Sequence, residues 1–224
     1  MILRESGAVT LIGGAGAGRA GLDAALRHAP VVVAADGGAD TALAAGITPR
    51  AVIGDFDSIS AAARARLPEE TLHPIAEQDS TDFEKCLARV AAPLIIGVGF
   101  SGARLDHQMA VCNALVRHPL QRCVLLGETD LMFLCPPALS LPLAAGCRVS
   151  LFPMGAVEGA SEGLDWPIGG INFAPDGRVG TSNRAQGPVS LSVTAPKMLV
   201  ILPADTLGTV VDALMASPAT WSPA

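Results

Sequence analysis

Aspartates stand at several points of the sequence where an apolar, strand-like run gives way to a loop or a helix. Asp55 and Asp57 follow the run Ala51–Ile53 within a Gly-Asp-Phe-Asp-Ser string. Residues two apart in an extended segment point to the same side, so both carboxylates can face one cation. The other acidic residues at such positions are Asp36, Asp79, Asp82 and Asp106.

These carboxylates indicate a site for a hard divalent cation, because carboxylates gathered in one place repel one another unless a cation neutralises them. A ligand set of oxygens favours Mg²⁺, which takes one or two carboxylates and completes its shell with water and substrate phosphates. Such a site suits phosphoryl transfer, with Arg104 as a planar clamp for a phosphate. Either Asp82 or Asp106 can accept a hydroxyl proton, and the sequence does not choose between them.

Individual aspartates also have a purely structural explanation. Asp79 or Ser80 suits the N-cap of a helix expected over Thr81–Val90, and Asp57 can cap a helix that begins near Ser58. A single aspartate at the start of a helix is common for this structural reason alone. The joint occurrence of acidic residues at successive strand ends favours the cation site.

A glycine-rich loop near the start supports a second hypothesis. Gly16, Gly18 and Gly21 follow the first strand-like run with the spacing G-x-G-x-x-G, and Asp36 ends the second run. This pattern is typical of a dinucleotide-binding loop, in which backbone N–H groups bind a pyrophosphate and the acidic residue binds a ribose. A Rossmann-type NAD(P)-dependent oxidoreductase is therefore the alternative function, although it leaves the other aspartates unexplained.

The first part of the chain alternates β-like and helical runs, which predicts an α/β domain with a mainly parallel sheet. Its strands are expected at Ala8–Gly13, Val31–Ala35, Ala51–Ile53, Leu94–Val98 and Cys123–Leu126. Its helices are expected at Leu22–His28, Asp40–Ala45, Ala61–Leu67, Thr81–Val90 and Leu105–Val116. The carboxyl ends of parallel strands lie along one edge, where such folds bind ligands, so the fold brings the aspartates together.

The pattern changes after about Cys135, where short apolar runs separated by Pro and Gly replace the helical periodicity. The runs are Leu139–Leu143, Cys147–Phe152, Val189–Val193 and Met198–Leu202, with a short helix expected at Thr206–Ala216. They predict an all-β, sandwich-like domain, so we place the domains at residues 1–135 and 136–224. Trp166, one of two tryptophans, is either part of that core or a flat face for an aromatic cationic ligand.

Composition narrows the class of protein. Half of the 224 residues are apolar and 16% are charged, which predicts a globular chain. The net charge of −6 argues against nucleic-acid binding, and with only two lysines, cationic contacts to phosphate fall to arginine. The five cysteines form no CxxC pair and are expected to be reduced in a cytoplasmic protein. No signal peptide and no membrane helix are expected.

Six short motifs occur in order over almost the whole chain, from about residue 10 to 203. They are Ala35-Asp36-Gly37-Gly38, Gly54-Asp55-Phe56-Asp57-Ser58, Asp79-Ser80-Thr81-Asp82-Phe83-Glu84-Lys85, Arg104-Leu105-Asp106-His107, Gly163-Leu164-Asp165-Trp166-Pro167 and Gly180-Thr181-Ser182-Asn183. Together they resemble the thiamine pyrophosphokinase family. Any one of them would be a weak signal, whereas the ordered set is specific.

The resemblance implies an N-terminal α/β domain, a C-terminal β-sandwich and a homodimer that holds thiamine between domains of different subunits. The implied reaction converts ATP and thiamine into thiamine diphosphate and AMP. By this resemblance, Asp55, Asp57 and Asp82 hold Mg²⁺, with Asp106 beside them. The implied ATP contacts are Asp36, Gly37, Gly38, Arg104 and His107. The implied thiamine contacts are Gln78, Thr81, Trp166, Ser182 and Asn183.

Three positions depart from the pattern of the family. Ala103 stands where a second glycine is common, Glu77 where Asp is common and Val111 where Asn is common. The added methyl group of Ala103 changes how closely the loop can approach a phosphate. These departures affect the expected fit of the substrate more than the expected type of reaction.

Overall fold

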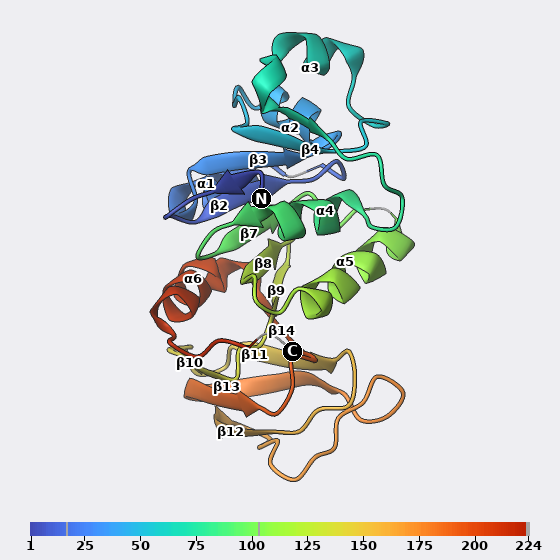
Figure 1. Ribbon diagram of the computed structural model, residues 1–224. Coiled ribbons are helices and arrows are strands. Elements are labelled where there is room, and N and C mark those ends of the chain that lie inside the picture. The colour runs from blue at the N-terminus through green and yellow to red at the C-terminus, as the bar shows by residue number, and fades with distance from the viewer. Residues whose placement is uncertain (17, 103, 223–224) are drawn as a thin grey trace. The chain divides into compact units, whose positions relative to one another are not determined.

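The computed structural model describes residues 1–16, 18–102 and 104–222, so Ala103 lies outside the described residues. Two compact units make up the chain (Figure 1). The first contains Met1–Ala114 and Leu125–Glu128, and the second contains Leu115–Val124 and Thr129–Ala224. The strands of the first unit pair in parallel and those of the second pair antiparallel, as the change in sequence pattern predicted.

Parallel strands of the first unit follow the order β7-β2-β3-β4-β5. Their bounds are Ile95–Val98 for β7, Val9–Ile12 for β2, Val31–Ala35 for β3, Ala51–Gly54 for β4 and Leu72–Pro74 for β5. Strands β2, β4 and β7 are buried at every position, which is typical of a parallel sheet covered on both faces. The predicted strands are confirmed within one or two residues, whereas β5 was not predicted because its Leu-His-Pro sequence carries no strand pattern.

Helices connect these strands. They are α1 at Arg19–His28, α2 at Gly38–Ala44, α3 at Ala61–Arg66, α4 at Asp82–Arg89 and α5 at Leu105–Arg117, with a 3₁₀ turn at Glu69–Thr71. The predicted N-caps were wrong. Ser60 rather than Asp57 caps α3, and Thr81 rather than Asp79 or Ser80 caps α4, with its hydroxyl accepting from the Glu84 N–H at 3.3 Å.

Two short strands stand apart from this sheet. Strand β1 (Leu3–Arg4) pairs in parallel with β6 (Val90–Ala91), which follows α4 directly. Each strand has only two residues, so the sequence pattern did not predict either of them. Strand β8 (Cys123–Leu126) was predicted, and the division between the two units passes through it.

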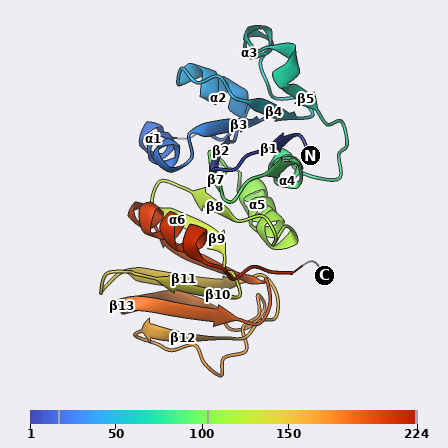
Figure 2. The ribbon, with the colours of Figure 1, turned by 60° about the vertical axis from the view of Figure 1, so that its left-hand side comes forward.

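The second unit is built from antiparallel strands in the order β10-β13-β11-β14-β9, with β12 also paired to β13 (Figure 2). The bounds are Asp130–Leu134 for β9, Ala138–Leu141 for β10, Arg148–Pro153 for β11, Gly159–Leu164 for β12, Gly180–Val193 for β13 and Met198–Pro203 for β14. A 3₁₀ turn at Ala204–Thr206 leads into α6 at Leu207–Ala216. The antiparallel pairing and the final helix are confirmed. Strands β9 and β12 and the first half of β13 were not predicted.

The division of the chain lies earlier than the predicted boundary near Pro136. Strand β9 pairs antiparallel with β14 along its whole length, from Leu134 opposite Leu199 to Asp130 opposite Pro203. This pairing places Asp130–Leu134 in the second unit, although those residues precede the boundary that composition suggested.

Arg122 anchors the end of the chain within the second unit. Its guanidinium group donates hydrogen bonds to the carbonyl oxygens of Leu214, Ser217 at 2.7 Å and Ala219 at 3.2 Å. The indole N–H of Trp221 donates to the Cys135 carbonyl oxygen at 3.1 Å. The bond from Arg122 to Leu214 satisfies a carbonyl group in the last turn of α6, where carbonyl groups have no partner inside the helix.

Within the described ranges, the helices are all too short or too polar to span a lipid bilayer.

Candidate active site

Asp36 directly follows β3 and fixes the loop that follows β4. Its backbone is left-handed, with φ of 42°, and the residue is only 2% exposed. The two carboxylate oxygens accept hydrogen bonds from the backbone N–H groups of Ser58 at 3.1 Å and Ile59 at 2.8 Å. Burial raises the pKa of Asp36 to about 6, although these two hydrogen bonds favour the ionised form.

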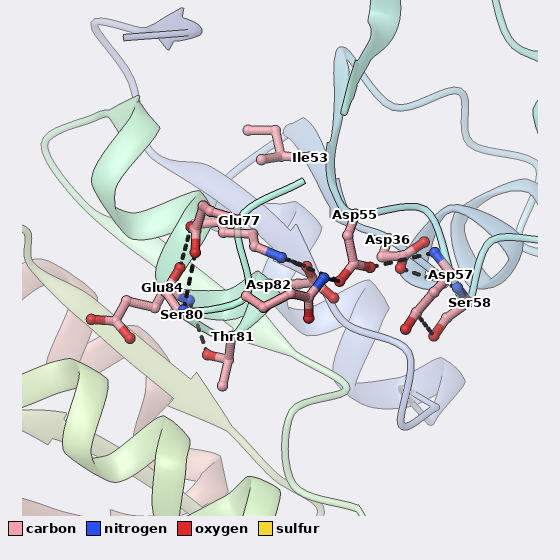
Figure 3. Close-up of polar contacts among 12 residues, drawn as sticks. Asp36, Ile53, Asp55, Asp57, Ser58, Glu77, Ser80, Thr81, Asp82 and Glu84 are labelled. Atoms are coloured by element: carbon pink, nitrogen blue, oxygen red, sulfur yellow. Dashed lines mark hydrogen bonds and ion pairs between the residues drawn. The ribbon is translucent and has the colours of Figure 1, made fainter. Parts of the chain in front are cut away.

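Asp36, Asp55 and Asp57 bring carboxylate oxygens within 4.8 Å of one another (Figure 3). Phe56, between the last two, is also left-handed with φ of 65°, a conformation that costs free energy and is frequent at functional sites. The three donors are all oxygens, they come from the ends of neighbouring strands, and their charges repel. This donor set fits Mg²⁺ in kind and in placement.

Lys85 supplies the positive charge beside these carboxylates. Its side chain is 2% exposed, and its ammonium nitrogen lies 3.1 Å from an Asp82 oxygen and 3.5 Å from an Asp55 oxygen. The same Asp55 oxygen accepts a hydrogen bond from the Gln78 amide at 2.9 Å. Asp82 and Lys85 lie three residues apart on one face of α4, whereas Asp55 belongs to the loop after β4. One ammonium group thus holds carboxylates from two segments.

The pKa shifts around Lys85 have distinct causes. The hydrogen bond from Gln78 is the main reason that the pKa of Asp55 is lowered. Burial is the main reason that the pKa of Asp82 is raised, despite the lysine beside it. Burial alone would lower the pKa of Lys85, but the contacts with Asp82 and Asp55 outweigh it and raise the pKa. Lys85 is therefore an ammonium ion at neutral pH.

Lys85 ends one of the six motifs, but no role was predicted for it. Arginine was expected to supply the cationic contacts to phosphate. The available signal was a lysine three residues after Asp82, in a chain that has only two lysines. What the sequence did not show is that this side chain turns inward.

The glycines of the site allow close packing of the backbone. A Cβ at Gly54 would lie 2.7 Å from the Asp36 Cβ and 3.2 Å from an Asp82 oxygen. A Cβ at Gly38 would collide with the Ile12 carbonyl oxygen, and one at Gly37 would lie 3.3 Å from Ser58. Gly37 and Gly38, expected as ATP contacts, thus have a packing role in the structure.

Arg104 and Asp106 form a separate pair at the start of α5. The guanidinium group lies 2.7 Å from the Asp106 carboxylate, and both side chains are about two-thirds exposed at 68% and 65%. The hydrogen bond from Arg104 lowers the pKa of Asp106. His107 is exposed as well. In the described part of the chain, the group of three carboxylates does not include Asp106.

Of the residues expected to contact thiamine, Gln78 and Thr81 lie in the first unit. Gln78 donates to Asp55, and the Thr81 hydroxyl caps α4. Glu77, one of the departures from the family pattern, accepts from the N–H groups of Asp79 at 2.9 Å and Ser80 at 3.1 Å. Val111, another departure, is buried in α5.

The remaining expected thiamine contacts lie together in the second unit. Trp166 is 59% exposed in the loop after β12. Asn183 is buried and hydrogen-bonded to the backbone of Trp166, and Ser182 is left-handed with φ of 61°. The structure thus brings the expected residues together in two groups, one in each unit.

The dinucleotide-binding alternative is not favoured by the structure. Both oxygens of Asp36 accept backbone hydrogen bonds from the loop after β4, whereas the alternative needs them for a ribose. The third glycine of that fingerprint normally allows a helix and a strand to pack closely. A Cβ at Gly21 has no neighbour within 4 Å, so this requirement is missing here.

Residues 22–125 match the family model described as "Thiamin pyrophosphokinase, catalytic domain". Over this segment the chain is similar to the thiamine pyrophosphokinase family. The matched segment contains Asp36, Asp55, Asp57, Asp82 and Lys85, whereas Trp166, Ser182 and Asn183 lie beyond it.

Two plant proteins illustrate the similarity to curated relatives. The chain is 28% identical over 154 residues to thiamine pyrophosphokinase 3 of Oryza sativa subsp. japonica, covering 60% of this chain and 58% of the relative. It is 27% identical over 154 residues to thiamine pyrophosphokinase 1 of Arabidopsis thaliana, with the same coverage. The similarity therefore spans somewhat more than half the length of these relatives.

Solved structures share the fold at low sequence identity. A thiamin pyrophosphokinase from Geobacillus thermodenitrificans superposes with a TM-score of 0.74 at 22% identity, over 89% of this chain and 99% of that one. The thiamin pyrophosphokinase from Candida albicans superposes with a TM-score of 0.72 at 16% identity, over 90% and 92% of the two chains. These similarities support the fold of each of the two units.

Proposed function

We propose that this chain transfers a pyrophosphoryl group from ATP to the hydroxyl group of thiamine, giving thiamine diphosphate and AMP. The observation that carries the proposal is the group of oxygens from Asp36, Asp55 and Asp57, with Asp82 attached through Lys85. This arrangement lies inside the segment that matches the catalytic-domain model of the family. It meets the main need of phosphoryl transfer, which is neutralised and oriented charge.

Asp55 and Asp57 are the carboxylates that would hold Mg²⁺, and Asp36 and Asp82 flank them. When bound, Mg²⁺ neutralises charge on the phosphate oxygens of the nucleotide. Lys85 and Gln78 hold Asp55 in place through one of its oxygens and leave its other oxygen facing the Asp57 N–H at 3.4 Å. Asp36 lies in the same group, but both of its oxygens accept backbone hydrogen bonds from Ser58 and Ile59, so we propose that it fixes the loop that carries Asp57.

The proposed reaction makes one bond and breaks one bond at the β-phosphorus of ATP. The oxygen of the thiamine hydroxyl group bonds to that phosphorus, the bond from it to the oxygen bridging the α-phosphorus breaks, and AMP leaves with that oxygen. The hydroxyl proton must pass to a base. Of the two carboxylates left open by the sequence, we favour Asp82, because it lies beside Asp55, whereas Asp106 is paired with exposed Arg104.

Substrate contacts remain proposals for this chain. For ATP they are Asp36, Gly37, Gly38, Arg104 and His107, among which Arg104 offers a planar cationic group at the surface. For thiamine we propose Gln78, Thr81, Trp166 and Ser182, among which Trp166 offers an exposed aromatic face. Asn183, which resemblance also assigned to thiamine, is buried and bonded to the backbone of Trp166, so we propose that it belongs to this site without a contact of its own. We also propose a homodimer, which light scattering coupled to size-exclusion chromatography tests directly.

The deciding experiment measures AMP formed from ATP in the presence of thiamine and Mg²⁺. We expect AMP and thiamine diphosphate in equal amounts, with no AMP when thiamine is left out or when EDTA is present. Asp55→Asn and Asp57→Asn should each lower turnover by at least about a hundredfold, with far-ultraviolet circular dichroism unchanged.

Asp23→Asn is the matched control. Asp23 lies in α1 and its carboxylate is partly exposed and bonded to Arg19, so its loss should leave turnover unchanged. Near-normal, Mg²⁺-dependent activity of Asp55→Asn or Asp57→Asn would rule out the metal assignment. A wild-type protein that binds both substrates without forming AMP would instead be a sensor, and the proposed reaction would be rejected.

A further inference from the structure

Trp166 carries a large exposed ring, and its backbone is hydrogen-bonded to the side chain of Asn183. The residue is 59% exposed, although it lies between two hydrogen bonds to one buried amide. The Trp166 N–H donates to Oδ1 of Asn183 at 3.2 Å, and the Trp166 carbonyl oxygen accepts from Nδ2 of Asn183 at 2.7 Å. One side chain thus fixes both backbone polar groups of this residue.

The amide of Asn183 is largely used by these contacts. Its oxygen also accepts from the Arg184 N–H at 2.8 Å, so both lone pairs of that oxygen have donors. Asn183 is 7% exposed, which leaves little surface for a ligand. The side chain therefore suits a role behind the binding surface better than a direct contact with a substrate.

A β-bulge in β13 accounts for the inward position of Asn183. Between the pairs Val149–Asn183 and Leu151–Gly180, β13 advances three residues while β11 advances two. Ser182, inside this interval, is left-handed, and its N–H donates to the Ser150 hydroxyl at 3.0 Å. The extra residue re-aims the side chain that follows it, as bulges beside functional sites do.

The neighbouring residue is fixed by a second set of bonds. The Asp165 N–H donates to the Arg184 carbonyl oxygen at 2.9 Å, and the Arg184 guanidinium group lies 2.6 Å from the Asp165 carboxylate. The loop at Asp165 and Trp166 is thus attached to β13 at two consecutive residues. An exposed ring on an attached backbone loses less conformational freedom when a ligand stacks on it.

We propose that Asn183 is a positioning residue that acts through Trp166, holding the exposed indole in place for a flat, cationic ring of the substrate. The inference rests on the proposed function, because that function supplies the thiazolium ring of thiamine as the ligand. A cation over the face of an indole is attracted by the ring. Asn183 itself touches no atom of the substrate.

The first test removes each partner and measures thiamine KM, kcat and the KM for ATP. Trp166→Ala should raise the KM for thiamine about tenfold, as expected for loss of a partly exposed cation–π contact. Asn183→Ala should raise it roughly threefold or more, with kcat and the KM for ATP nearly unchanged. Ser190→Ala, an exposed site elsewhere on β13, is the control and should change neither constant.

The double variant separates a role through Trp166 from a direct substrate contact and from a general structural role. If Asn183 acts only through the indole, Trp166→Ala and Trp166→Ala/Asn183→Ala should have the same thiamine KM within about twofold. A direct contact with thiamine would make the double variant clearly weaker than Trp166→Ala, and so would a general structural role. Either result would overturn the proposal.

A ligand-free measurement reports the position of the ring without any turnover. The chain has two tryptophans, so Trp221→Phe leaves Trp166 as the only fluorophore of its kind. In that background, Asn183→Ala should lower the fluorescence anisotropy of Trp166, and Ser190→Ala should not. Unchanged anisotropy in Asn183→Ala would overturn the proposal.

Two further outcomes are decisive. If Asn183→Ala does not fold, Asn183→Asp takes its place, because it keeps the accepting oxygen and sets a second oxygen against the Trp166 carbonyl group. If the wild type forms no AMP from ATP and thiamine, the proposed function fails and the substrate part of this inference fails with it. In that case lowered anisotropy would still show that Asn183 holds Trp166, so the two failures are distinguishable.

Discussion

The ammonium group of Lys85 lies 3.1 Å from the Asp82 carboxylate and 3.5 Å from that of Asp55. This contact joins helix α4 to the loop after β4, and it does so away from water, since the lysine is 2% exposed. A buried cation between two carboxylates limits where those carboxylates can move. We regard it as the internal support of the aspartate site.

Removal of the Lys85 ammonium group should destabilise the folded protein. Lys85→Met should lower the free energy of unfolding by about 2–4 kcal/mol, because it leaves two partly buried carboxylates beside each other without their cation. Lys197→Met is the matched control, since Lys197 is the other lysine of the chain and lies in the second unit. Urea denaturation measures both, and Asp82→Asn added to Lys85→Met should restore part of the loss. Equal effects at the two lysines would contradict this account.

Gly54 should tolerate no side chain. A Cβ there would meet the Asp36 Cβ at 2.7 Å and an Asp82 oxygen at 3.2 Å, so Gly54→Ala should destabilise the protein by about 1–3 kcal/mol and displace the carboxylates. Gly21→Ala is the counterpart in a helix, where a Cβ has open space, and it should stabilise by up to about 1 kcal/mol. Thermal unfolding compares the two. Destabilisation by Gly21→Ala would show that close packing at this glycine had been underestimated.

Asp36 should make stability depend on pH. Its pKa is raised to about 6 in the folded protein from an ordinary value of 3.8, so the folded state binds a proton more tightly than the unfolded state. Its favourable contribution is therefore complete below pH 4 and is lost as the pH rises to about 6, by up to about 3 kcal/mol.

The comparison with Asp36→Asn isolates this effect, because Asn resembles the protonated carboxyl group and does not titrate. In EDTA, the free energy of unfolding of the wild type minus that of Asp36→Asn should be smaller at about pH 7 than at about pH 4.5. Urea denaturation at the two pH values measures the difference. A difference that grows with pH would mean that the two backbone hydrogen bonds from Ser58 and Ile59 outweigh burial.

Asp106 and Asp57 should differ in their effect on cation binding. Asp57 shares the group of three carboxylates, whereas Asp106 pairs with Arg104 at the surface. We expect Mg²⁺ to raise the melting temperature of Asp106→Asn as much as that of the wild type, and to have almost no effect on Asp57→Asn. Calorimetric scans with and without Mg²⁺ provide the test, and loss of the shift in Asp106→Asn would place that residue at the cation.

The sequence predicted the fold where its pattern was strong. Val31–Ala35 and Ile95–Val98 are apolar runs with β-branched residues, and both are strands. Strand β12 has the sequence Gly-Ala-Ser-Glu-Gly-Leu and contains a bulge at Gly163, where φ is 77°, so no regular alternation marks it. The start of β13 was missed for a related reason, because its Gly-Thr-Ser-Asn sequence also suits a turn.

The sequence located the acidic residues of the site but not their contacts. Position at the ends of parallel strands was enough to predict that Asp36, Asp55 and Asp57 meet. The hydrogen bonds of Asp36 depend on its left-handed backbone, and the inward turn of Lys85 depends on how α4 packs, neither of which follows from residue spacing. The exposed position of Asp106 likewise depends on tertiary structure.

The guanidinium group of Arg122 binds carbonyl oxygens from the last turn of α6 and from the segment after it. Because one guanidinium group binds both, release of the segment alone would leave this half-buried charge with one of these three acceptors, the Leu214 oxygen. Fraying at this end is therefore coupled to the helix rather than gradual, and the last turn of α6 and the following residues should exchange their amide protons as one cooperative unit.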